Sequence, residues 1–422
     1  MYRKTRLANG VRVITHDMPT MQSVAVGVWI YAGGRFENAE NKGISHYLEH
    51  LLFKGTRKYS LRKLKESIEG VGGSFNGFTS EEATCYLVKL PHRYLDVGLD
   101  VLADMVINPL LPALEIEKER SVILEELKMY RDLPQSYVYE LLDELLWPAQ
   151  MLGLSVIGTV ESINRIDRER LAGYKETHYS PRNIVVSAAG RLTHTAVVKK
   201  AARLFSGLAN PHANAFDQVT IENSRPQLHI LDKGTEQAHL AMGFHSLHRD
   251  HPLKHAQGLM HIILGGNMSS RLFNEVREKK GLAYEIGTQV KRFQDTGAFL
   301  VHAGMDNVKV SDTLAVILKE AGKLTRTLVT ENEFKRAKEF YLGQLELALE
   351  DTMDCMLWIG ESTVMLDRVR TLGEVIKEVE RVRRPELREV AQEVFKEEKI
   401  KCALIGPVKD KEVQIAAALH IG

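Results

Sequence analysis

The sequence is short of cysteine, carries no excess charge of either sign and has no long apolar run. Its 422 residues include three cysteines, Cys85, Cys355 and Cys402, which lie far apart. Such a set cannot form a disulfide framework or a paired-cysteine metal knuckle, and it is typical of a reducing compartment. The formal net charge of +1 lacks the basic excess with which proteins bind nucleic acids or anionic lipids. We therefore expect no nucleic-acid partner.

Segments that would enter a membrane or direct secretion are not evident either. The longest stretch that looks apolar, 24–34, is shorter than the roughly 20 residues needed to span a bilayer. Residues 1–14 have mixed polarity, without the apolar core of a signal peptide. The length favours two or three domains, and a hydrophobic content of 44% is ample for buried cores. We expect a soluble, cytoplasmic protein with no membrane partner.

Predicted strands and helices follow one another in nearly the same order in the two halves of the chain. Gly-Ile-Ser-His at 43–46 lines up with Gly-Leu-Met-His at 258–261, and Glu-Lys-Glu-Arg at 117–120 lines up with Glu-Phe-Lys-Arg at 333–336. The offsets in residue number, 215 and 216, are nearly equal. These matches favour a duplicated domain of about 200 residues over the chance similarity of two α+β domains.

The expected fold is therefore α+β, with two homologous domains that each pack an antiparallel sheet against helices. A polar stretch at 209–224, which contains asparagine and proline, is the natural linker. The domains are predicted at 1–212 and 222–422.

The segment His46-Tyr47-Leu48-Glu49-His50 carries an H-x-x-E-H pattern on a predicted helix. Residues three and four apart share one helix face, so His46, Glu49 and His50 would point the same way. Two imidazoles one turn apart can chelate one Zn²⁺, and a carboxylate between them can take a proton from water. The alternative is a solvated face that carries these residues by coincidence. The composition gives on the order of 0.08 such matches by chance, which favours a metal site.

A catalytic zinc site needs a third protein ligand and an open position for water. Two glutamates of the predicted helix 114–131 differ in their surroundings. Glu126 has apolar or aromatic residues three and four positions away, whereas Glu125 has polar neighbours there. A carboxylate in an apolar stripe is costly to bury unless it is paired or binds a metal, so Glu126 is the better ligand. Glu119, seven residues earlier on the same face, is suited to orient a ligand imidazole by a hydrogen bond. A half-buried salt bridge is the alternative for either residue, and the competing acidic residues of this helix are Glu115, Glu117 and Glu125.

The combination of H-x-x-E-H with Glu119 and Glu126 resembles the pitrilysin/insulinase family of zinc metallopeptidases, which carry the inverted zinc motif. The likeness is greatest to the short bacterial members and to the β subunit of the mitochondrial processing peptidase. The separation of His50 and Glu126 along the chain matches that family's third-ligand spacing. Further family-like blocks occur along nearly the whole chain: Lys54-Gly55-Thr56, 32–37, 72–80, 179–183 and 268–284.

The resemblance implies one zinc ion per chain, held by His46, His50 and Glu126, with Glu49 as the base. It implies that Arg277 and Tyr284 reach the site from the second domain, where they would stabilise an oxyanion and bind substrate. Without it, Arg277 would be a surface charge and Tyr284 a core residue. The resemblance also places Asn76 on an edge strand to which an extended substrate would add as a further strand. Gly77 stands where alanine is expected.

The second half of the duplication lacks the metal-binding residues. His46 corresponds to His261, but Glu49 and His50 correspond to Leu264 and Gly265. We therefore expect this half to bind and position substrate without a second zinc site, and His261 to be a packed or capping residue.

The sequence thus predicts a zinc-dependent endopeptidase that cleaves unfolded or short peptides, bound as an added strand in a closed chamber. The resemblance implies a two-chain assembly, and a homodimer is the simpler form because this chain has both the zinc motif and the arginine–tyrosine pair. A heterodimer with a paralogue is the alternative. Two functional alternatives are compatible with the sequence: a non-catalytic subunit or scaffold, and specific leader-sequence processing in place of general peptide degradation.

Overall fold

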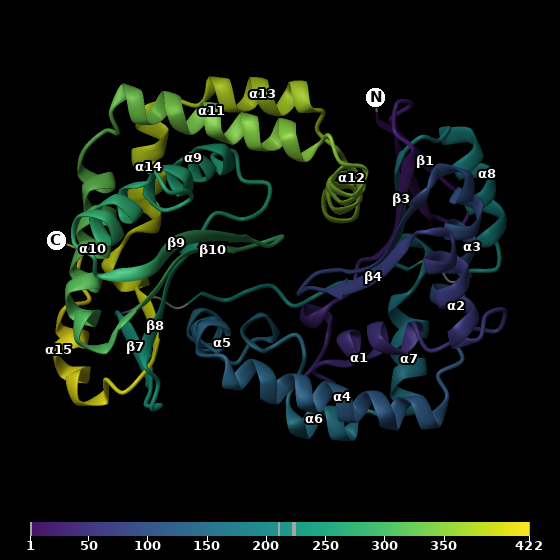
Figure 1. Cartoon of the computed structure of the whole chain (residues 1–422), viewed down its shortest axis with the longest axis horizontal. Coiled ribbons are helices and arrows are strands. Elements are labelled where there is room, and N and C mark those ends of the chain that lie inside the picture. The colour runs from purple at the N-terminus through teal and green to yellow at the C-terminus, as the bar shows by residue number, and fades with distance from the viewer. Residues whose placement is uncertain (1, 210–211, 222–224, 422) are drawn as a thin grey trace. The chain divides into compact units, whose positions relative to one another are not determined.

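A computed structural model describes residues 2–209, 212–221 and 225–421 (Figure 1). The chain forms two compact units, and neither is one continuous segment. The first unit comprises Met1–Lys128, Leu154–Asp217 and Glu346–Thr371. The second unit comprises Met129–Gly153, Gln218–Leu345 and Leu372–Gly422.

The first unit is built on a six-stranded sheet in the order β1-β2-β6-β3-β5-β4. Its central strands are rich in valine and alanine and are buried on both faces, as expected for strands that are covered by helices on both sides. β2 and β6 are parallel, and the other neighbours are antiparallel. The strands are β1 (Tyr2–Arg6), β2 (Arg12–Asp17), β3 (Ser23–Ile30), β4 (Ser74–Thr79), β5 (Thr84–Pro91) and β6 (Ile184–Gly190).

The second unit contains a five-stranded sheet in the order β7-β11-β8-β10-β9. This order repeats β2-β6-β3-β5-β4 of the first unit, and the parallel pair, here β7 and β11, occupies the equivalent place. Each sheet is therefore mixed, whereas an antiparallel sheet was expected. The repeated order shows that the two units share one topology. The strands are β7 (Gln227–Leu231), β8 (Gln237–Ser246), β9 (Ala283–Arg292), β10 (Gly297–Asp306) and β11 (Lys401–Ile405).

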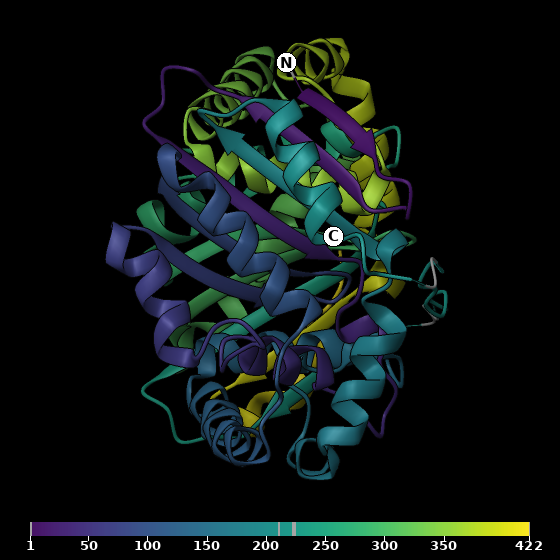
Figure 2. The ribbon, with the colours of Figure 1, turned by 90° about the vertical axis from the view of Figure 1, so that its right-hand side faces the viewer.

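Helices cover both faces of the first sheet. α3 and α8 pack on one face, and α12 packs on the other against β3 and β6 (Figure 1). Figure 2 looks onto the face that α3 and α8 cover, with the strands crossing behind them. The helices of this unit are α1 (Ile44–Leu52), α2 (Leu61–Ile68), α3 (Leu95–Ile107), α4 (Ala113–Asp132, of which the last residues belong to the second unit), α6 (Val160–Arg165), α7 (Arg168–His178), α8 (His194–Leu204) and α12 (Thr352–Leu366).

In the second unit, α5 packs against β8 and β11. α14 contacts α9 and α10, and each of these three helices contacts the sheet. A π-helical turn, Phe273–Lys279, precedes β9. The helices of this unit are α5 (Pro134–Leu146), α9 (Lys254–Leu264), α10 (Val310–Arg326), α11 (Glu331–Ala348, of which the last residues belong to the first unit), α13 (Leu372–Arg381), α14 (Arg384–Val394) and α15 (Glu412–Ala417).

Each half of the sequence contributes one helix to the unit formed by the other half. α12 lies in the second half, yet Cys355, Met356 and Ile359 pack into the core of the first unit beside Trp29. In the same way, Leu142 of α5 packs into the core of the second unit. The predicted ranges 1–212 and 222–422 follow the duplication in the sequence, whereas the compact units exchange these two helices.

In the described parts of the chain, no helix combines the length and the apolar character needed to cross a membrane. All three cysteines are buried and free.

Candidate metal centre

Helix α1, which carries the H-x-x-E-H pattern, is fixed at its N-terminus by a buried carboxylate. The two oxygens of Glu37 accept hydrogen bonds from the backbone nitrogens of Gly43 (2.9 Å) and Ser45 (2.8 Å). An acidic group at this end of a helix satisfies free N–H groups and interacts favourably with the helix dipole. Tyr47 and Leu48 are fully buried, which sets the rotation of the helix about its axis. This anchoring turns the histidine face toward α4.

Three side chains from α1 and α4 converge. The rings of His46 and His50 lie 4.6 Å apart. Glu126 Oε2 lies 3.7 Å from His46 Nε2 and 3.8 Å from His50 Nε2. One atom from each residue lies within 4.8 Å of the other two. Tetrahedral zinc ligands bound at about 2.0–2.2 Å lie roughly 3.3–3.6 Å from one another, so the three atoms need only a small inward movement to share one ion.

The electrostatics of these residues also suit a cation. Burial lowers the pKa of His46 to about 3, and the neighbouring His50 acts in the same direction. The imidazole is therefore neutral, as a metal ligand must be. Burial raises the pKa of Glu126, while His50 opposes that rise. A divalent ion would supply the positive charge that this half-buried carboxylate lacks, so the donor set fits such an ion.

Glu119, predicted to orient a ligand imidazole, lies directly behind His50. Its Oε2 is 3.0 Å from His50 Nδ1, and its Oε1 is 2.5 Å from Lys54 Nζ. A carboxylate at Nδ1 holds the proton on that nitrogen and leaves Nε2 as the free donor atom. Lys54 in turn fixes the carboxylate. The three residues form a chain that points His50 Nε2 toward Glu126.

Glu49 lies beside the three converging side chains and is held from strand β4. Thr79 Oγ1 donates a hydrogen bond of 2.9 Å to Glu49 Oε2. Gly77, on the same face of β4, leaves space for the carboxylate, since a Cβ there would lie 3.0 Å from Glu49 Oε1. Burial raises the pKa of Glu49, and the hydroxyl of Thr79 and the charge of His50 counteract this effect. A raised pKa suits a group that both accepts and releases a proton.

The sequence reasoning assigned no role to Thr79 or Glu37. Thr79 follows Gly77 by two residues, and this spacing puts both on one face of a strand. That periodicity is the signal that could have found Thr79. Glu37 contacts α1 across a loop, and no local pattern indicates such a contact.

Asn76 lies on the edge strand β4, as expected from the resemblance, but its side chain is on the face opposite to Gly77 and Thr79. It is exposed, and its Oδ1 accepts a hydrogen bond of 2.9 Å from Gly77 N. β4 pairs with β5 and ends the described sheet, so its outer backbone groups are available to an added strand.

Arg277 and Tyr284 belong to the second unit, where the structure brings them together. The guanidinium of Arg277 lies 4.9 Å from the centre of the Tyr284 ring. Arg277 is part of the π-helical turn, a feature that often occurs at functional sites. Tyr284 is 75% exposed, so the alternative of a core position for it is wrong.

His261 occupies the place of His46 in the second unit. Its Nδ1 lies 2.7 Å from Thr288 Oγ1, which makes it a packed residue. Leu264 and Gly265 provide no metal ligand, and the one cluster of potential ligands found among the described residues is that of His46, His50 and Glu126.

Comparison with known proteins places this geometry in a family. The family model described as "Insulinase (Peptidase family M16)" matches residues 12–160, and that described as "Peptidase M16 inactive domain" matches residues 165–341. An uncharacterized zinc protease of Streptomyces coelicolor is 35% identical, over 99% of this chain and 92% of its own length. The chain belongs to the peptidase M16 family. A second relative, the uncharacterized zinc protease YmxG of Bacillus subtilis, is also 35% identical, over 96% of this chain and 98% of its own length.

Solved structures show the same M16 fold. A protease from Helicobacter pylori superimposes with a TM-score of 0.90 at 23% identity, covering 96% of this chain and 99% of that one. A structure described as a peptidase M16 inactive domain, from Pseudomonas fluorescens, gives a TM-score of 0.89 at 18% identity, covering 96% and 98%. The M16 fold and the family resemblance expected from the sequence are thereby confirmed.

Proposed function

We propose that this M16 chain is a zinc-dependent endopeptidase with one zinc ion per chain. The observation that carries the proposal is the convergence of His46, His50 and Glu126, with Glu49 held beside them. The names of the relatives as zinc proteases support the choice of metal. A zinc ion in this place supplies a Lewis acid that activates water and polarises the peptide carbonyl.

Glu49 performs the proton transfers in this proposal. Its carboxylate accepts a proton from the attacking water and passes it to the amine that leaves. Thr79 bonds to one oxygen of Glu49 and leaves the other free for this transfer. Glu119 and Lys54 keep His50 in its orientation throughout.

The substrate is proposed to be an unfolded or short peptide that adds to β4 as a further strand, beside Asn76. An edge strand recognises main-chain hydrogen-bonding groups, so the peptide must be extended before it can bind. Arg277 and Tyr284 would contribute donors for the oxyanion that forms on the attacked carbonyl. We further propose that two chains, most simply two copies of this one, enclose the peptide in a chamber. If the Tyr284 hydroxyl is an oxyanion donor, Tyr284→Phe should lower turnover roughly 10²–10³-fold.

The decisive experiment compares the wild type with Glu49→Gln in two measurements. Zinc content per chain is determined by atomic emission, and cleavage of a quenched fluorescent peptide is followed over time. We expect both proteins to hold one zinc ion, and Glu49→Gln to lose turnover because the amide cannot accept the proton. A non-catalytic subunit or scaffold would cleave nothing in either form.

The range of peptides that the protein cleaves distinguishes specific leader processing from general degradation. Mass spectrometry of a digested peptide library should show cleavage of many unrelated peptides if degradation is the task. A processing enzyme would leave most of the library intact.

A further inference from the structure

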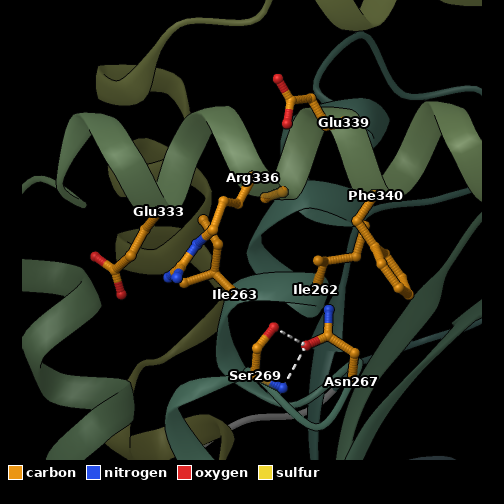
Figure 3. A pocket seen from close by; sticks show the side chains of 9 residues that line it. Ile262, Ile263, Asn267, Ser269, Glu333, Arg336, Glu339 and Phe340 are labelled. Atoms are coloured by element: carbon orange, nitrogen blue, oxygen red, sulfur yellow. Dashed lines mark hydrogen bonds between the residues drawn. The ribbon is translucent and has the colours of Figure 1, made fainter.

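The second unit contains a cavity between α9 and α11 that the proposed peptidase chemistry does not use. Its volume is about 420 Å³, within the range of roughly 300–1,000 Å³ common for small-molecule sites. Figure 3 shows Arg336 extending from α11 toward Ile263 of α9, with Phe340 beside Ile262. Asn267 and Ser269, in the loop after α9, close one side.

The duplicated topology identifies the equivalent place in the first unit. α1 and α4 correspond to α9 and α11, with Tyr47 matching Ile262 at an offset of 215 and Arg120 matching Arg336 at 216. The ring of Tyr47 is fully buried there, and its hydroxyl donates to the backbone carbonyl of Ile116. The guanidinium of Arg120 lies 5.8 Å from the centre of this ring. Isoleucine replaces tyrosine in the second unit, and the cavity lies beside this smaller side chain.

Arg336, unlike its equivalent Arg120, donates no hydrogen bond to a backbone carbonyl of the described residues. In the first unit, Arg120 donates a hydrogen bond of 2.8 Å to the carbonyl of Ile166. Val382 is the equivalent of Ile166 at an offset of 216, and Lys338 donates to its carbonyl at 2.8 Å. Arg336 has no hydrogen-bond or ion-pair partner among residues 2–209, 212–221 and 225–421. Its charge is therefore available to a ligand.

The remaining polar groups of the cavity leave one further donor. Glu333 is neutralised by Arg271, whose Nε and second guanidinium nitrogen lie 2.8 and 3.0 Å from its two carboxylate oxygens. Asn267 Oδ1 accepts from the backbone nitrogen and the hydroxyl of Ser269. The side-chain nitrogen of Asn267 donates to no described residue and points toward Ile262 and Phe340 (Figure 3). Glu339 also lines the cavity, and its carboxylate lies 3.9 Å from Lys335 Nζ, which offsets its charge. The cavity thus offers two donors and an apolar wall.

We propose that this cavity binds a small aromatic carboxylate, either free or as the C-terminal aromatic residue of a peptide. The ring occupies the space that Tyr47 fills in the first unit, against Ile262 and Phe340. The carboxylate pairs with Arg336 and accepts from Asn267, since charge-assisted hydrogen bonds of this kind are the stronger ones. The site does not depend on zinc.

The test measures binding of 3-(4-hydroxyphenyl)propionate by ligand-observed NMR titration. We expect saturable binding to the wild type with a Kd on the order of 1 mM or tighter, given the size of the ligand. Arg336→Gln should weaken binding at least tenfold, and the corresponding propanamide should bind at least tenfold more weakly than the acid. Lys319→Gln removes an exposed positive charge on α10, outside this cavity, and should change nothing.

A second pair of variants tests the ring position. Ile262→Tyr should fill the cavity and abolish binding, while Phe340→Ala, a change at a partly exposed residue, should weaken binding without unfolding the protein. Chelation of zinc should leave the affinity unchanged, so this proposal and the peptidase proposal can fail separately. Absence of binding to the wild type, or equal affinity in Arg336→Gln and the wild type, would overturn the site.

The source of the carboxylate is tested in the Glu49→Gln background, which prevents cleavage. A peptide that ends in tyrosine is compared with the same peptide amidated at its C-terminus. Binding of the free acid form, lost in Arg336→Gln, supports a peptide terminus as the ligand. Binding of the small acid alone supports a free metabolite of the same chemistry.

Discussion

The side chains around the candidate metal centre have two kinds of role: some are placed to bind the ion, and others orient those ligands. Glu126 approaches both imidazoles, whereas Glu119 touches one imidazole from behind and never enters the centre itself. Thr79 likewise positions Glu49, because it donates a hydrogen bond to only one of the two carboxylate oxygens. A carboxylate that has its second oxygen free can exchange protons, and a carboxylate bound on both sides cannot do so easily. The neighbours of each acid therefore decide its role.

Substitution should distinguish Glu126, the proposed zinc ligand, from its neighbour Glu125 on α4. Glu126→Gln is expected to weaken zinc binding by more than about 10²-fold, because a neutral amide replaces a charged ligand and the loss should exceed the roughly 10–100-fold typical of an orienting residue. Glu125 is exposed and pairs with Lys128 at 2.7 Å, so Glu125→Gln is the matched control and should bind zinc normally. Competition with a chromophoric chelator measures both affinities. Equal losses in the two variants would contradict the ligand assignment.

The convergence at this site could be predicted from the sequence only in part. The spacing within H-x-x-E-H is local, so helix geometry alone brought His46 and His50 together. The apolar neighbours of Glu126 in the sequence predict it as the ligand, yet of these Ile123 is buried while Val122 and Met129 are about half exposed. The carboxylate of Glu126 is therefore placed by the helix face toward α1, and not by the apolar stripe as a whole.

At the scale of elements, the exchanged helices are the feature that the sequence did not reveal. The apolar spacing of α5 indicates a helix with one buried face, but periodicity shows that a face is buried without showing what buries it. Close approach of α12 to the first sheet depends on glycine. A Cβ on Gly27 would lie 2.5 Å from Met356 Sδ, and one on Gly360 would overlap the indole of Trp29. These contacts connect segments from opposite halves of the sequence.

Two glycines on helices allow a matched test of this packing. Gly360→Ala should lower the free energy of unfolding by about 1–3 kcal/mol, because the added methyl group overpacks the contact with Trp29. Gly343→Ala lies on α11 with nothing within 4 Å and should raise stability by up to about 1 kcal/mol through helix propensity. Urea denaturation followed by circular dichroism measures both changes. Stabilisation by Gly360→Ala would show that α12 does not pack this closely in solution.

The contact of α5 with the second sheet should make stability depend on pH. His245 of β8 is buried against Trp147, and its Nε2 lies 2.6 Å from the carbonyl oxygen of Leu146. Burial lowers the pKa of His245 from 6.5 to about 4. Between these values the unfolded chain binds a proton that the folded one does not, so the free energy of unfolding rises with pH across this window.

As the pH falls from about 6.5 to 4, this residue should cost up to about 3 kcal/mol of stability. His245→Gln, which keeps a donor for the Leu146 carbonyl, should flatten the dependence over the same range. Because Trp147 lies 6.1 Å from the His245 ring, its fluorescence during urea unfolding reports on this region. A wild type and a variant with parallel pH profiles would exclude the assignment to His245.

At the scale of the whole molecule, the duplication was the most predictable property. Equivalent strands and helices keep nearly the same offset in residue number along most of the chain, so two short sequence matches were enough to indicate it. The parallel pair within each sheet was not foreseen, because strand direction depends on connections that pass through other elements. No sequence pattern indicated which segments the two units exchange.

The proposed two-chain assembly predicts a solution mass. One chain has a mass of 47.6 kDa, so a homodimer should appear at about 95 kDa by light scattering coupled to size exclusion, with two zinc ions per particle. A particle of one chain that cleaves peptides would contradict the requirement for a second copy.

The exchange of α5 and α12 has a consequence for fragments of this chain. If the chain were cut within 209–224 and its halves separated, each sheet would lack the helix that the other half supplies, and the apolar face of each exchanged helix would meet water. We therefore expect that neither half folds alone, and that the two halves regain their structure only when they are mixed.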